Sequence, residues 1–171
     1  METIPFDTIQ SAIDNVCSIN TEEQLDQISQ DLFEAQPGLA GFLIEFIEDM
    51  GDGAKDLGFM MALVLWKSFQ EKYPHIRALS EDEVVARFEE QEADLEKLLQ
   101  VDEDMIEEMQ KAEALNGQPE VFNYVTQELF GTAEDEIELS DDEEVHLFMV
   151  LRFFSTCLND LAKETSSPLK H

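Results

Sequence analysis

The chain has 171 residues, of which 40 are acidic and 10 are basic, and its formal net charge at pH 7 is -30. This balance argues against direct binding to nucleic acid, because phosphate contacts need a basic surface. An anionic membrane surface would repel the chain for the same reason. A chain of this length is expected to form one domain with its own core. We place that single domain at residues 1–165, followed by a flexible tail at 166–171.

Apolar residues recur at helical spacing along most of the chain, and alternation with a period of two is almost absent. In the first half, the predicted helices are Ile4–Ile19, a second helix that Asn20 or Thr21 caps and Pro37 ends, Pro37–Met50, and Ala54–Tyr73. In the second half they are Ser80 to about Gln100, Asp102–Leu115, Pro119–Phe130, and Ser140 to about Glu164. Residues 132–139 are predicted to form an acidic connector. The fold class is therefore all-α, a bundle of about eight helices.

Two helix starts carry a specific capping signal. Ser80 is followed three residues later by Glu83, and Ser140 by Glu143, which is the spacing of a capping box. The helices at 54–73 and 140–164 are apolar on nearly all sides. Such helices have to be covered from several directions, so we expect these two to lie at the centre of the bundle.

The two halves of the chain resemble each other. Each contains a Gln-Pro junction, Gln36-Pro37 and Gln118-Pro119, and the two junctions are 82 residues apart. An internal duplication would divide the domain at about 1–79 and 80–165 and give two similar four-helix halves or a short α-solenoid-like stack. The alternative is that any eight-helix chain with proline breaks offers such a match.

The N-terminal residues include two acids and no base, and no apolar run follows, so we expect no secretory leader. No apolar stretch approaches the roughly 20 residues that span a bilayer. Cys17 and Cys157 both lie in apolar helical patterns, which favours two buried, reduced thiols over a disulfide. The predicted location is the cytoplasm.

Candidates for chemistry are few. Glu143 and His146 are three residues apart, so they share a helix face and are weak candidates for metal ligands, but a bundle metal site needs a second such pair and further carboxylates. A surface histidine is the favoured interpretation. We predict no cofactor and no enzymatic activity; a metal-dependent helical-bundle enzyme remains a further alternative. Arg152 lies within an apolar helix and is expected to pair with a carboxylate, with a site for an anionic ligand as the alternative.

The acidity is concentrated in the second half, where residues 81–113 contain 14 acids against three bases. We predict a non-enzymatic interaction or regulatory module that binds a basic partner protein through a face around the fifth and sixth helices. The candidate partner-binding residues are Phe88, Glu89, Glu92 and Glu96. One alternative is a DNA mimic, because two adjacent acidic helices would approach the charge density of a duplex. A solvated surface with no partner is another alternative, and a homodimer stays open.

Overall fold

The computed structural model describes residues 3–131 and 139–166, and these residues form eight α-helices, one 3₁₀ helix and no strand. The first half contains α1 (Phe6–Cys17), α2 (Glu22–Ala35), α3 (Pro37–Ile47) and α4 (Asp52–Lys72). The second half contains α5 (Glu81–Lys97), the 3₁₀ helix η1 (Leu98–Gln100), α6 (Glu103–Asn116), α7 (Pro119–Phe130) and α8 (Asp141–Ser166). The predicted all-α bundle is confirmed. Most of the predicted acidic connector (132–138) and most of the predicted tail (167–171) lie outside the described residues.

Local signals set most of the helix ends. The hydroxyls of Ser80 and Ser140 accept from the amides of Glu83 and Glu143 at 3.2 and 3.1 Å, and each carboxylate accepts from its serine amide in return. Both predicted capping boxes are therefore confirmed. The fifth helix was predicted to continue to about Gln100. Its α-helical part ends at Lys97, and the last turn tightens into η1, as helix ends often do.

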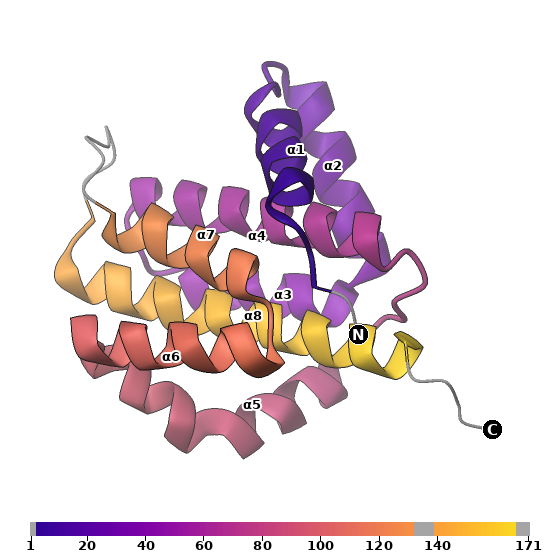
Figure 1. Cartoon of the computed structure of the whole chain (residues 1–171). Coiled ribbons are helices and arrows are strands. Elements are labelled where there is room, and N and C mark those ends of the chain that lie inside the picture. The colour runs from indigo at the N-terminus through magenta and orange to yellow at the C-terminus, as the bar shows by residue number, and fades with distance from the viewer. Residues whose placement is uncertain (1–2, 132–138, 167–171) are drawn as a thin grey trace.

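α4 and α8 pack against each other at the centre of the bundle, with α1 and α2 on one side and α5 and α6 on the other (Figure 1). The run 61–66 of α4 and the run 147–151 of α8 are buried without interruption. The expectation that these two apolar helices are central is met. α1 packs on α4 and α7, and α5 packs on α8 and α3.

The two Gln-Pro glutamines are buried, and each accepts a hydrogen bond from an amide shortly before the first helix of one half. The Gln36 side chain accepts from the amide of Leu79, at the entrance to α5, at 3.1 Å. The Gln118 side chain accepts from the amide of Ile4, at the entrance to α1, at 2.8 Å. Both amides are buried, so each would lose a hydrogen bond at considerable cost without its glutamine. The Gln118 contact joins the two halves, and the Gln36 contact fixes the chain at the boundary between them.

Among the described helices, α8 is the one with the length and apolar composition to cross a membrane: an 18-residue window within Asp141–Glu164 has a mean hydropathy of 1.2. Of that apolar window, 67% is buried inside the bundle. The central helix of a bundle needs the same composition, because other helices surround it.

The cysteines differ from the prediction in one respect. Cys157 is buried, as predicted, but Cys17 is exposed, and both thiols are free. The buried face of α1 is formed by Ile9, Ala12 and Val16. Cys17 follows Val16 directly, and at about 100° per residue it falls outside that face.

Candidate functional site

One stripe of α5 consists of residues that recur every three to four positions, Glu81, Val85, Glu89, Glu92 and Glu96. At 3.6 residues per turn these side chains leave the helix within an arc of roughly 80°, and all five are exposed. Within the described residues, the side chains of Glu89, Glu92 and Glu96 form no ion pair or hydrogen bond. We call these five residues the α5 acidic stripe. It contains the three glutamates predicted from the sequence to bind a partner.

Phe88, the fourth predicted partner-binding residue, lies at the edge of this stripe and is half-buried. Its ring centroid is 5.1 Å from that of Phe42 in α3 and 5.3 Å from that of Phe153 in α8. The ring therefore holds α5 against both helices. Val85, which the sequence analysis did not single out, is the exposed apolar side chain within the stripe, at 49%.

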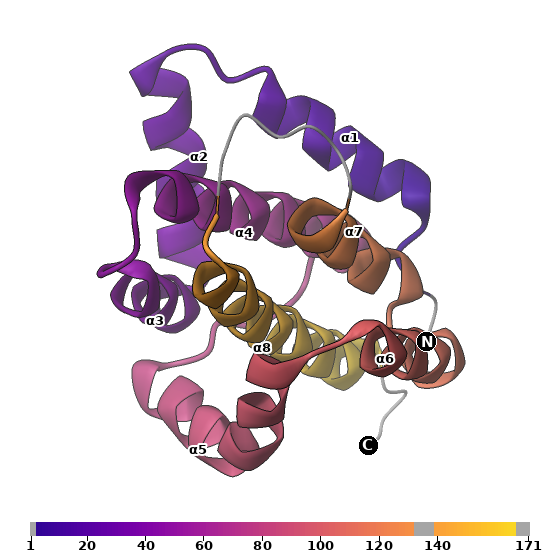
Figure 2. The ribbon, with the colours of Figure 1, turned by 90° about the vertical axis from the view of Figure 1, so that its left-hand side faces the viewer.

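α5 and α6 do not form one surface of paired helices. α5 packs on α3 and α8, whereas α6 packs on α7, and Figure 2 shows α5 and α6 apart from each other. Their acidic residues therefore do not lie on one pair of packed helices.

The two metal-ligand candidates already have protein partners. The Glu143 carboxylate accepts from the amides of Ser140 and Gly51, at 3.1 and 2.9 Å. These two amides, Ser140 first, hold the pKa of Glu143 below its ordinary value. The ring nitrogen Nδ1 of His146 lies 2.7 Å from the carbonyl oxygen of Asp142. No group of three His, Cys, Asp or Glu side chains that could hold a metal ion occurs in residues 3–131 and 139–166.

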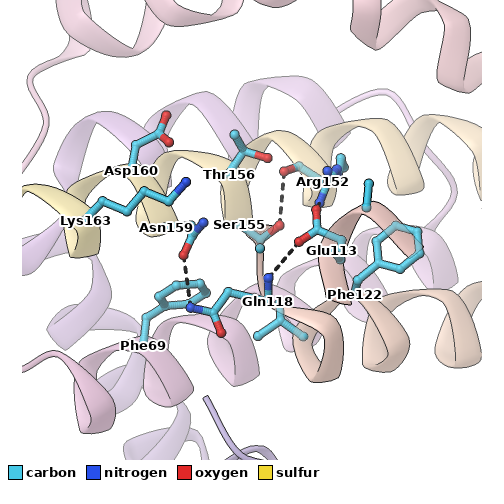
Figure 3. Close-up of a pocket in the computed structure, with 13 residues that line it drawn as sticks. Phe69, Glu113, Gln118, Phe122, Arg152, Ser155, Thr156, Asn159, Asp160 and Lys163 are labelled. Carbon is cyan, nitrogen blue, oxygen red and sulfur yellow. Dashed lines mark hydrogen bonds and ion pairs between the residues drawn. The ribbon is translucent and has the colours of Figure 1, made fainter. Parts of the chain in front are cut away.

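A cavity of about 260 Å³ lies where α6, α7 and α8 meet (Figure 3). One wall belongs to α8, and the others come from the end of α6, the start of α7 and one residue of α4. The lining residues are Phe69, Ala112, Glu113, Gly117, Gln118, Val121, Phe122, Arg152, Ser155, Thr156, Asn159, Asp160 and Lys163. Polar groups are well represented among them, which is unusual for a place bordered by two core helices.

Arg152 at one end of this cavity pairs with Glu113 of α6, as the sequence analysis expected of a carboxylate. The pair is largely enclosed, because the side chains are only 27% and 10% exposed. The other oxygen of Glu113 accepts from the amide of Gln118 at 2.7 Å, and the guanidinium lies 5.4 Å from the ring centroid of Phe122. The charge of Arg152 is thus matched within the protein, and its position is fixed on three sides.

The α8 wall of the cavity is a polar stripe at i, i+4, i+7 and i+11, formed by Arg152, Thr156, Asn159 and Lys163. Both acids that line the cavity have a cationic partner, since Glu113 pairs with Arg152 and Asp160 with Arg87 of α5, at 3.1 Å. Within the described residues, the Lys163 amine has no ion pair or hydrogen bond. We call Thr156, Asn159 and Lys163 the α8 donor stripe.

Arg152 was predictable from the sequence as a paired cation, but the rest of this wall was not predicted. The available signal was the run of polar residues at helical spacing through an otherwise apolar helix. What the sequence could not indicate is that α6 and α7 stop short of this face and leave a cavity beside it.

The chain matches no family model, and neither a curated protein nor a solved structure matches it.

Proposed function

We propose that this protein is an interaction module that binds a basic partner protein through the α5 acidic stripe. The observation that carries the proposal is the row of exposed glutamates at positions 89, 92 and 96, whose carboxylates form no ion pair within the described residues. Glu92 lies three residues after Glu89 and four before Glu96, so all three carboxylates are neighbours on one helix face.

Such a row lowers the stability of the free protein. Like charges at these spacings destabilise a helix by about 0.2–0.5 kcal/mol per pair. The last of the glutamates also lies close to the negative end of the α5 dipole. Cationic side chains of a partner would relieve this repulsion and speed the encounter.

The three arginines of the chain are engaged elsewhere. Arg77 pairs with Glu83 and Glu164, Arg87 with Asp160 and Arg152 with Glu113. These arginine ion pairs therefore connect α5, α6 and α8. None of the three arginines neutralises a glutamate of the α5 acidic stripe. Val85 supplies exposed apolar area in the middle of the stripe, which supports affinity, since affinity comes mainly from buried apolar contacts.

The test compares two variants with the same change in charge. E89Q/E92Q/E96Q neutralises the stripe, and E22Q/E23Q/D26N neutralises three exposed acids of α2. Wild type and both variants are immobilised and exposed to lysate in low salt, bound proteins are eluted with NaCl, and each candidate is then purified for calorimetric titration. We expect a basic protein that binds wild type and the α2 variant with 1:1 stoichiometry and binds the stripe variant at least tenfold more weakly.

Competition with duplex DNA distinguishes a DNA mimic from an acidic surface that binds the partner elsewhere. If excess duplex displaces the partner, the partner's own DNA site is the one occupied, and the protein acts as a DNA mimic. If the α2 variant loses binding as strongly as the stripe variant, net charge alone attracts the partner and the stripe is not a site. If neither variant changes what is captured, the acidity only solvates the surface and the proposal is wrong.

A further inference from the structure

We propose that the cavity between α6, α7 and α8 is a binding site for a small carboxylate, held by the α8 donor stripe. This site is separate from the α5 acidic stripe and does not depend on the function proposed above. The observation that carries it is a set of hydrogen-bond donors on one helix face that line the same cavity and have no partner within the described residues.

The donors can be counted from the contacts that are already made. The carbonyl oxygen of the Asn159 side chain accepts from the Gln118 side chain at 3.0 Å, which leaves the NH₂ group of Asn159 as the unused donor. Within the described residues, the Thr156 hydroxyl and the Lys163 amine have no hydrogen-bond partner. Lysine is a donor only, and the amide NH₂ is a donor only. A ligand that meets all three groups has to supply acceptors.

The charges around the cavity point to an anion. Four charged side chains line it, two cations and two carboxylates. Both carboxylates are engaged, Glu113 with Arg152 and Asp160 with Arg87. Among the residues that the structure describes, Lys163 is then the lining charge that has no ion pair, and a single carboxylate would balance it. Screening confines electrostatic interactions to about 8 Å at physiological salt, so this local arrangement counts for more than the distant acids of the chain.

The geometry of the wall suits a carboxylate group. Figure 3 shows the Lys163 side chain extending along α8 towards Asn159, beside Asp160, with Thr156 farther along the helix. A helical side chain leans towards the N-terminus of its helix, which brings the lysine amine towards Asn159, one turn earlier on the same face as Thr156. A carboxylate has two oxygens and about four lone-pair positions, enough for all three. The volume of about 260 Å³ is below the range of drug-sized ligand sites, so the ligand is a compact one.

The experiment is a titration followed by amide NMR signals of the full chain. The probes are acetate and glycolate, and the reference titration uses NaCl at the same ionic strength. We expect saturable shifts for the amides of Thr156, Asn159 and Lys163 with at least one probe and not with chloride. K163M should weaken binding about tenfold or more, through the loss of a charge-assisted hydrogen bond. K163R should retain most of it.

The matched control is K111M. Lys111 is an exposed lysine of α6 that pairs with Glu108, so its removal changes the net charge equally and should leave the probe affinity unchanged. T156V keeps the shape of the side chain and removes one donor, and it should weaken binding without altering the fold. The proposal is overturned if neither probe gives saturable shifts, if chloride gives the same ones, or if K163M binds the probes as wild type does.

Discussion

The absence of a side chain at Gly117 leaves room for the largely enclosed ion pair between Glu113 and Arg152. A Cβ at this position would overlap the carboxylate of Glu113, which is bonded to Arg152 and to the amide of Gln118. A side chain at 117 therefore has to push Glu113 away from both partners. The glycine follows α6 directly and lets its last turn close over the α7 junction.

We predict that Gly117→Ala destabilises the fold by about 2 kcal/mol, because overpacking and a disturbed buried ion pair both raise the energy of the folded state. Gly41→Ala is the control, since a Cβ there meets nothing within 4 Å and alanine is the better helix former by about 0.5–1 kcal/mol. Urea unfolding followed by the fluorescence of Trp66, the single tryptophan, measures both. Equal midpoints for the two variants would contradict the argument.

The two thiols should differ sharply in reactivity. Cys17 is exposed, whereas burial raises the pKa of Cys157 to about 12, so almost none of its reactive thiolate is present at neutral pH. We expect a thiol reagent at pH 8 to label one cysteine quickly in the native protein and two in urea. Rapid labelling of both in native buffer, or the loss of the fast phase only in C157S, would show that Cys157 is accessible.

Several side-chain roles were predictable because they depend on neighbours in the sequence. The capping boxes at Ser80 and Ser140 are examples, since both partners lie within one turn. The partner of Arg152 was predictable as a carboxylate but not as Glu113, which is 39 positions away in the chain. Gln36 and Gln118 were noticed for the prolines that follow them, and their contacts with distant amides could not be foreseen.

The helices themselves followed from the sequence for a related reason. Proline starts α3 and α7 at their first positions, where its missing N–H costs nothing. The periodicity of α5 indicated which face is buried, with Val84 and Leu95 inward. It could not indicate which helices cover that face. The structure shows that α6 packs on α7, whereas α5 packs on α3 and α8, and the partner-binding face around the fifth and sixth helices stays a prediction.

Glu143 connects two helix starts, since it caps α8 and accepts from Gly51 at the start of α4. The pKa of Glu143 is lowered by the Ser140 and Gly51 amides, so its charged form is favoured by folding. A lowered folded pKa stabilises the protein above the ordinary pKa of glutamate, and the stabilisation is lost as the pH falls through the lowered value.

We therefore predict that Glu143→Gln is less stable than wild type at pH 7 and that the difference shrinks progressively below about pH 4.5, the ordinary glutamate value. Urea midpoints across this pH range measure it. Glu107→Gln, on the exposed surface of α6, controls for the removal of one charge. A difference between wild type and Glu143→Gln that stays constant down to pH 3 would mean that the carboxylate charge is not what matters.

For the chain as a whole, the equivalent contacts of Gln36 and Gln118 bear on the predicted duplication. In addition, α1 meets α4 of its own half and α7 of the other, while α5 meets α8 of its own half and α3 of the other. Exchanging the halves maps each of these contacts onto the other, as a twofold relation between two four-helix units would. Duplication remains a prediction, and this exchange of contacts is the feature that a common origin of the halves would have to explain.

The net charge of the chain affects the free energy of unfolding. With a formal charge of -30, the folded state holds its acids closer together than the unfolded state does, so self-repulsion opposes folding. Dissolved salt screens this repulsion, and the Debye length falls from about 30 Å at 0.01 M to about 8 Å at 0.15 M. The arginine ion pairs lose strength under the same conditions, but they are few, and the Arg152–Glu113 pair is largely enclosed and screened less.

We predict that raising NaCl from about 0.01 to 0.15 M increases the free energy of unfolding by about 1 kcal/mol or more, a sum over several like-charge neighbours at 0.2–0.5 kcal/mol each. Trp66 fluorescence in urea measures the change. E89Q/E92Q/E96Q should be more stable than wild type in low salt and should gain less from added salt, because part of the repulsion is already removed. A fall in stability with added salt would mean that the ion pairs between helices outweigh the repulsion among the acids. The α5 acidic stripe would then have no net repulsion for a basic partner to relieve.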